Sequence, residues 1–247
     1  GAERNIAIGH RSLEVLCGSS GVQNVAIGTE TLVRATNACA NVAIGRNALC
    51  CSLTSHNNVA IGSDVASNMT AGCNVAVGAG AMRCATTGTR NTAVGYFAGA
   101  DPGLCVLTSE CNYAFLGNAA TSCFLMATSL TVTSDGRDKV DIGSNPYGLD
   151  FVNALNPITF KFDRRGFYDD LIPNGTCKET KCRYGFIAQE VAAAEAQVNP
   201  DGPLLIANEE NPEMAVLTET NLIPALVAAV QELTARVEAL ENPDAVN

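Results

Sequence analysis

Tryptophan is absent from this chain of 247 residues, and aromatic residues of all kinds make up only 5% of it. Aromatic side chains supply much of the volume of ordinary globular cores, so their scarcity argues against a bulky core and favours thin, regular packing. Apolar residues still make up 47% of the chain, which is enough for a real core. No apolar run reaches the roughly 18 residues of a transmembrane helix, so we expect no membrane insertion.

Lysine and proline are missing from most of the first half. The first lysine is Lys139, and Pro102 is the only proline before residue 134, whereas eight prolines follow that point. Charge changes at the same place: residues 1–133 hold six Arg and six acidic residues, so residues 134–247 carry the whole net charge of −10. These coincident changes predict two domains, 1–133 and 134–247. Neither has a basic stripe, so we expect no nucleic-acid partner.

Histidine is scarce, whereas cysteine is common. The two histidines, His10 and His56, lie far along the chain from the closely spaced Cys177 and Cys182, so we predict no zinc site, no other metal and no cofactor. The eleven cysteines are odd in number and lie mostly inside a repeat, which favours free thiols in a reducing compartment. At Cys177 and Cys182 a local disulfide remains the alternative.

A short motif recurs through the first half. It reads NIAIG at 5–9, NVAIG at 24–28, 41–45 and 58–62, NVAVG at 74–78 and NTAVG at 91–95. The steps between the asparagines are 19, 17, 17, 16 and 17 residues, and a weaker seventh copy, NYAFLG, starts at Asn112. A near-constant step of this length predicts a solenoid in which each unit stacks on its neighbours.

Each copy alternates in the way a strand does, and its glycine allows the turn that follows. We expect the β-branched residues to form the buried face and to stack into one apolar ladder, with the small pairs at 12–13, 48–49 and 81–82 as a second short strand. The asparagines either form a ladder of side-chain amides or merely suit the turn. The expected ladder consists of Val25, Ile27, Val42, Ile44, Val59 and Ile61.

The N-x-A-x-G pattern resembles the head repeats of trimeric autotransporter adhesins and the repeat shafts of phage tail fibres and tailspikes. This resemblance implies a mainly β repeat, a trimeric parallel β-roll or β-helix shaft, over residues 1–133. Catalysis in this region is not expected, because its few ionisable residues form no constellation.

Four motifs follow one another in the second half: SDGRDKVDI (134–142), ALNPITFKF (154–162), YGFIAQEV (184–191) and a C-terminal helical segment (221–241). Together they resemble the intramolecular chaperone domain of phage tailspikes and tail fibres, the endosialidase type also called peptidase S74. The resemblance implies an α+β domain that drives homotrimerisation and is then released by cutting itself off before the serine of the first motif.

Carried onto this chain, the resemblance places the scissile bond between Thr133 and Ser134. Ser134 would be the nucleophile and Lys139 its partner, which makes the domain a single-turnover serine peptidase with a Ser-Lys dyad. A serine hydroxyl needs a group that takes its proton, and lysine does so only when burial or a positive neighbour lowers its pKa. Asp135 and Arg137 would shape the turn or stabilise the oxyanion. The alternative is that Ser134 and Asp135 simply cap a turn.

Three further residues bear on the site. Asp138 adjoins Lys139, and a carboxylate that points at the ammonium group would weaken it as a base. Gln189 and Glu190 lie where a strand is expected to enter a helix. The resemblance implies that these two contact the emerging fibre, and the alternative is a surface pair at a helix start.

The last helix carries an apolar seam with the spacing of a coiled coil. Pro224 fits only the first turn, so we expect the helix to begin near Thr220 or Asn221. A helix packed on its own domain is the alternative to a trimeric coiled coil. The seam consists of Ile223, Leu226, Val230, Leu233, Val237 and Leu240.

The two resemblances together imply the C-terminal part of a phage tail fibre, assembled in the host cytoplasm and carried in the virion. Its C-terminal domain would align three chains, promote folding of the β fibre and then leave a tip that binds a host cell-surface receptor, either glycan or protein. The alternative is a trimeric structural fibre or adhesin that does not cleave itself and keeps its C-terminal domain as a permanent cap.

Overall fold

A computed structural model of the chain divides into two compact units, which we describe separately. One comprises residues 1–125 and 163–177, and the other comprises residues 126–162 and 178–247. The predicted domain boundary at 133/134 stays a prediction. The structure describes residues 4–15, 21–101, 105–121, 123–127, 129, 131–168, 170–200, 206–208 and 215–241.

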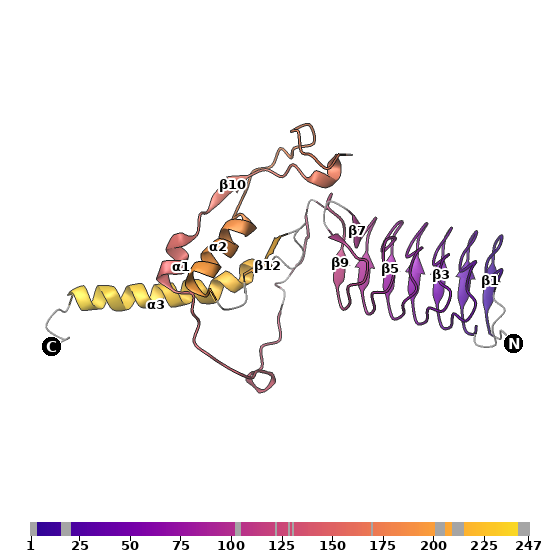
Figure 1. Cartoon of the computed structure of the whole chain (residues 1–247), viewed down its shortest axis with the longest axis horizontal. Coiled ribbons are helices and arrows are strands. Elements are labelled where there is room, and N and C mark those ends of the chain that lie inside the picture. Colours follow the sequence, from indigo (N-terminus) through magenta and orange to yellow (C-terminus); the bar gives the residue numbers. More distant parts are fainter. Residues whose placement is uncertain are drawn as a thin grey trace. The chain divides into compact units, whose positions relative to one another are not determined.

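The repeats form a parallel β-solenoid, as the sequence predicts. The chain winds into a coil by itself, because its strands pair in parallel in the order in which they occur along the chain (Figure 1). Equivalent residues stand in register, so that Val25 pairs with Val42 and Ile27 with Ile44. The strands of this sheet are β1 (Ile6–Ile8), β2 (Val25–Ile27), β3 (Val42–Ile44), β4 (Val59–Ile61), β5 (Val75–Val77), β6 (Thr92–Val94) and β9 (Ala114–Leu116).

The buried face of the sheet is not the one that the sequence predicts. In β2 to β6 the central alanine is at most 1% exposed, whereas the β-branched residues on either side of it are half-buried or exposed. The apolar ladder therefore exists, but it lies on the outside of the coil. A coil of about 17 residues is narrow, and alanine fits its interior opposite the larger side chains of the turn.

Those larger side chains come from the segment expected to be a second strand, which is a turn instead. Leu32, Leu49 and Met82 are fully buried there, and each has a left-handed backbone, with φ of 49°, 51° and 50°. Bonds to the next coil hold the turn, for example from the Leu32 N–H to the Ala48 carbonyl at 3.0 Å. The small apolar pairs thus supply the core without forming a strand.

The asparagines form a buried ladder, which decides between the two alternatives for them. Asn41 donates from its backbone N–H and its side-chain amide to Asn24 Oδ1 at 3.1 and 3.0 Å, and Asn58 repeats this pattern on Asn41 Oδ1. Asn24, Asn41, Asn58, Asn74 and Asn91 are at most 1% exposed. Hydrogen bonds on both sides of each amide make this burial of polar groups tolerable.

Glycine is required at the corner after each strand. Gly62 has φ of 141°, and a Cβ atom there would lie 2.6 Å from the carbonyl carbon and oxygen of Gly78 in the next coil. The corners therefore stack too closely for any side chain, which explains why every complete copy of the motif ends in glycine.

The seventh copy is shifted by one residue from the sequence alignment. Phe115 pairs with Ala93, and Tyr113, rather than Asn112, donates its backbone N–H to Asn91 Oδ1 at 2.9 Å. Tyrosine thus takes the last asparagine position and ends the ladder. A short antiparallel pair, β7 (Ala100–Asp101) with β8 (Cys105–Val106), lies between β6 and β9 in the chain.

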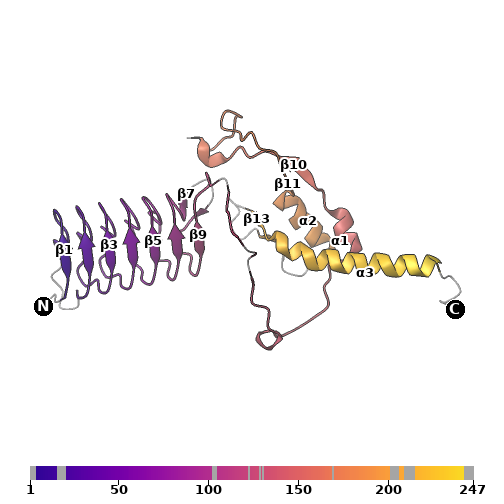
Figure 2. The ribbon, with the colours of Figure 1, turned by 180° about the vertical axis from the view of Figure 1, so that it is seen from behind.

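The second unit is a small α/β region that ends in a long helix, as the sequence predicts (Figure 2). The ALNPITFKF and YGFIAQEV motifs form a helix end with a strand and a strand that leads into a helix. Its elements are α1 (Leu149–Ala154), β10 (Ile158–Phe160), β11 (Arg183–Gly185), α2 (Ala188–Val198), β12 (Ala207–Asn208), β13 (Val216–Leu217) and α3 (Leu222–Glu241), with the short 3-10 helices η1 (Gly136–Asp138) and η3 (Glu219–Asn221). A third 3-10 helix, η2 (Arg165–Phe167), belongs to the first unit.

One apolar cluster joins the helices of this unit. Phe151 of α1, Val191 of α2 and Leu222 of α3 meet in it. The buried carboxylate of Glu195 accepts the backbone N–H groups of Ile206 and Ala207 at 2.9 and 2.8 Å, which fastens β12 to α2. The strands β10 and β11 pair antiparallel, and the Phe160 and Phe162 rings meet edge to face.

Helix α3 begins where the sequence predicts and has two different faces. Leu222, Ala225 and Ala229 are buried within the unit, and the Glu232 carboxylate accepts the Leu149 backbone N–H of α1 at 3.0 Å. The predicted seam lies elsewhere on the helix and is exposed, from 43% at Val237 to 81% at Leu240. Packing on its own domain therefore leaves the seam free.

Candidate cleavage site

The first motif of the second half lies in an exposed, mostly extended stretch. Residues 131–144 are all exposed, and Val132, Val140 and Ile142 are 78–83% exposed. The chain reverses only at η1, which buries no residue. The predicted nucleophile and its partner flank this turn.

Ser134 and Lys139 are in contact. Lys139 Nζ donates to Ser134 Oγ at 2.6 Å and lies 3.5 Å from the Ser134 carbonyl oxygen. Both side chains are exposed. The contact provides the short path for a proton that a Ser-Lys dyad needs, with the amine as hydrogen-bond donor in this arrangement.

The carboxylate of Asp135 holds the turn together. It accepts the Arg137 backbone N–H at 2.9 Å, and it binds the Arg137 guanidinium through Nε at 3.1 Å and Nη2 at 2.6 Å. The hydrogen bonds from the Arg137 side chain and backbone lower the pKa of Asp135 below its ordinary value. Within the described residues, no ion pair joins Asp138 to Lys139, and the Lys139 amine donates to Ser134 Oγ.

Gln189 and Glu190 are exposed in the first turn of α2. Glu190 Oε2 accepts from Asn156 Nδ2 at 3.2 Å and so links α2 to the segment before β10. The sequence analysis did not single out Asn156, because 34 residues separate it from Glu190 and no local pattern connects them. In the described part of the chain neither residue contacts Ser134 or Lys139.

The thiols and carboxylates do not assemble a second centre in the described ranges. Cys177 and Cys182 are free and exposed rather than joined in a disulfide. Burial raises the pKa of the Cys50 thiol to about 11, which keeps it protonated and unreactive. No described cluster of three His, Cys, Asp or Glu side chains could hold a metal ion, and no described helix could cross a membrane.

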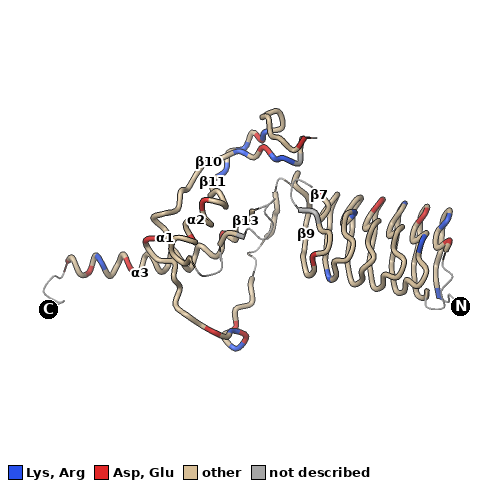
Figure 3. The backbone as a smooth tube through the Cα atoms, in the orientation of Figure 1, with Lys and Arg blue, Asp and Glu red and all other residues tan. Residues whose placement is uncertain are grey.

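In the described part of the solenoid, charged residues lie outside the seven-stranded sheet and mostly in the turns (Figure 3). Two of the ion pairs there join successive coils, Arg11 with Glu30 at 2.6 Å and Arg46 with Asp64 at 2.5 Å, whereas Arg11 also pairs with Glu14 inside its own turn at 2.7 Å. These pairs are largely exposed and contribute little individually. Among the residues of the solenoid that the structure describes, no charged constellation resembles a catalytic site.

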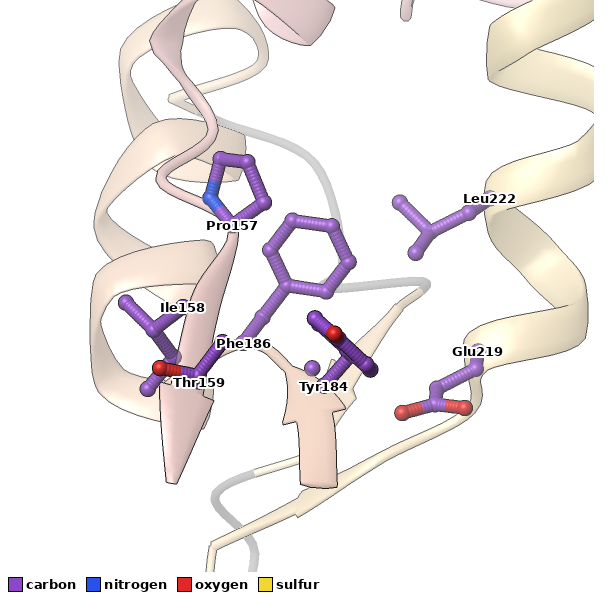
Figure 4. A pocket seen from close by; sticks show the side chains of 8 residues that line it. Pro157, Ile158, Thr159, Tyr184, Phe186, Glu219 and Leu222 are labelled. Carbon is purple, nitrogen blue, oxygen red and sulfur yellow. The ribbon is translucent and has the colours of Figure 1, made fainter. Parts of the chain in front are cut away.

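A pocket of about 620 Å³ opens beside β10 and β11. The Phe186 ring lies between Pro157 and Leu222, and the Glu219 carboxylate lies near Tyr184 (Figure 4). The pocket draws its lining from the second and third motifs and from the start of α3. It does not include the serine and lysine of the first motif.

Residues 134–200 match the model of the peptidase S74 family, described as the chaperone of endosialidase. The match begins at Ser134 and includes Lys139, Gln189 and Glu190. It spans less than half of the chain, and the solenoid and α3 lie outside it. Searches of curated proteins and of solved structures find no match to the chain.

Proposed function

We propose that this chain is the C-terminal part of a homotrimeric phage tail fibre, in which residues 134–247 act as an intramolecular chaperone and then detach by self-cleavage. The family match at 134–200 supports the chaperone role. The single observation that carries the cleavage step is the 2.6 Å contact between Lys139 Nζ and Ser134 Oγ, directly after the proposed scissile bond.

The proposed reaction breaks the Thr133–Ser134 peptide bond. Ser134 Oγ attacks the Thr133 carbonyl carbon while neutral Lys139 takes the hydroxyl proton. Lys139 returns that proton to the nitrogen that leaves, which becomes the α-amine of Ser134, and an ester joins Thr133 to Ser134 Oγ. Water then hydrolyses the ester to the Thr133 carboxylate and the free Ser134 hydroxyl.

Assembly would switch this reaction on. Lysine acts as a base only in its neutral form, which burial or a nearby positive charge favours. Ser134 and Lys139 are both exposed in the single chain, so the amine lacks that burial. Three chains that pack around this turn would desolvate the amine, so cleavage would wait until the trimer has formed.

Two exposed apolar surfaces support trimerisation. One is the α3 seam, and the other is the outer face of the solenoid sheet, where Ile6, Ile8, Val94 and Leu116 are 41–58% exposed. Each Val, Leu or Ile side chain moved from water into a packed interface stabilises the assembly by about 1.5–3 kcal/mol. Contiguous apolar surface of this kind marks an interaction site.

The solenoid also gives a reason for a chaperone. Its coils are nearly identical, so three chains displaced by one coil would still align most of their apolar faces. Non-local assemblies of strands form slowly and expose sheet edges meanwhile. A C-terminal unit that joins three chains at one point would set their register, and its removal would make dissociation and refolding harder to reverse.

The proposal places the fibre in the virion, after assembly in the host cytoplasm. The solenoid that remains after cleavage would form part of a tip that binds a glycan or protein on the host surface. Exposed polar turns between short strands provide a surface of that kind.

A denaturing gel and the intact mass of the purified trimer test the cleavage. We expect fragments 1–133 and 134–247 from the wild type, and one full-length chain from Ser134→Ala and from Lys139→Ala. Ser144→Ala and Lys161→Ala are matched controls, because both residues are exposed outside the dyad, and both should cleave normally. A wild-type trimer that stays full length would instead favour the fibre or adhesin with a permanent C-terminal cap.

A further inference from the structure

The contact between Ser134 and Lys139 depends on a sharp reversal of the chain. Their positions are five residues apart, and a fully extended segment of that length would separate the two Cα atoms by roughly 16 Å. The reversal is η1, which is three residues long, and none of these residues is buried by the described part of the chain. A helical turn this short is not stable by itself in water. Its own hydrogen bonds must therefore hold it.

One carboxylate supplies the side-chain part of these bonds, and backbone carbonyls supply the rest. Asp135 Oδ1 accepts the Arg137 backbone N–H and so caps η1. At the other end of the turn, the Lys139 backbone N–H donates to the Gly136 carbonyl at 3.3 Å. The cap thus fixes the direction in which the chain leaves the turn, and with it the place from which the Lys139 side chain reaches Ser134.

We propose that Asp135 is a positioning residue for self-cleavage, whose carboxylate caps the turn that brings Lys139 Nζ onto Ser134 Oγ. The inference rests on the proposed function, because it assigns a role within that reaction. It also assigns Arg137 to the turn: the guanidinium is bound to Asp135 on two nitrogens and braces the cap. Neither side chain contacts the serine hydroxyl or the lysine amine.

Substitutions at position 135 test this role, because some of them remove the negative charge but keep a side chain that can cap the turn. Asparagine and serine cap helix starts about as well as aspartate, whereas alanine cannot. We expect Asp135→Ala to slow cleavage about tenfold. This factor is the free energy lost with a helix cap, converted into a ratio of rates. Asp135→Asn and Asp135→Ser should cleave at close to the wild-type rate. Asp138→Asn is the matched control, because it removes a neighbouring carboxylate that makes no bond to this turn.

Cleavage rates are measured by quenched time courses on the purified trimer fraction, so that slow assembly is not mistaken for slow cleavage. Wild-type speed in Asp135→Ala trimers would overturn the inference and leave the proposed function intact. Equal slowing of the Ala, Asn and Ser variants would also overturn it, because charge rather than capping would then matter. Full-length chains in both the wild type and Asp138→Asn would instead refute the proposed function itself.

Discussion

Each coil of the solenoid contacts its neighbours through the same bonds again and again, whereas each contact in the second unit is made once. The Asn41–Asn24 bonds recur one coil later as Asn58–Asn41, but the bonds that Ile206 and Ala207 donate to Glu195 have no equivalent among the described residues. Repetition makes the solenoid regular but leaves its register against other chains ambiguous. The unique contacts of the second unit can define a single alignment, which suits it to guide the other region.

The largest expected effect removes the trimer contact in α3 through which the second unit would align three solenoids. Val230→Asp places a charge in the exposed α3 seam, where a trimer would have to bury it, so we expect a monomer in solution. Light scattering on the full chain measures this. Ala235→Asp is the matched control, because residue 235 is exposed on the helix but lies outside the seam. A trimer formed by Val230→Asp would show that the seam does not hold the chains together.

The second prediction compares a glycine in a closely packed corner of the solenoid with a glycine in an open part of the second unit. Gly62→Ala puts a Cβ atom 2.6 Å from the Gly78 carbonyl, at φ of 141°. Because neighbouring coils cannot separate without losing their ladders, we expect a loss of about 3 kcal/mol or more in the free energy of unfolding. Gly143→Ala in the second half meets nothing within 4 Å and should change stability little. Urea unfolding of both variants decides whether the corners are as tight as the structure indicates.

The smallest expected effect concerns acid stability in the second unit. The Leu149 N–H lowers the pKa of Glu232, and Arg236 lowers it further. A folded-state pKa below the unfolded value of about 4.3 means that the stabilisation is present above that pH and is lost as the pH falls through the folded value. Glu232→Gln keeps an acceptor for Leu149 but does not titrate.

Thermal unfolding between about pH 6 and pH 3 measures this difference. We expect the midpoint of Glu232→Gln to fall less than that of the wild type over this range. Glu241→Gln, at the end of α3, serves as the control and should follow the wild type. Parallel curves for the wild type and Glu232→Gln would mean that this carboxylate does not fasten α1 to α3.

Much of the fold could be predicted because the signals are local. The step of about 17 residues gives the coil, the terminal glycine of each motif gives the corner, and Pro224 gives the start of α3. The identity of the buried face could not be predicted in this way. Alternation places Val42 and Ala43 on opposite sides of a strand but does not say which side the coil encloses.

At the candidate site, too, local sequence signals predicted one part and only the folded structure showed the rest. The motif and its resemblance singled out Ser134 and Lys139, but spacing by itself could not show that their side chains meet. That contact spans a turn that the Asp135 carboxylate caps. The partner of Glu190 was missed because Asn156 comes close only through the packing of the β10 segment beside α2.

Sequence alone therefore determined the period of the coil, the glycine corners, the order of the C-terminal motifs and the seam of α3, since each depends on residues close together in the chain. Tertiary structure decided that alanine and asparagine face inward while valine and isoleucine face outward. The physical reason is volume: a narrow coil closes around its smallest side chains and around polar groups that can bond to their own copies, and only the closed coil makes that space limiting.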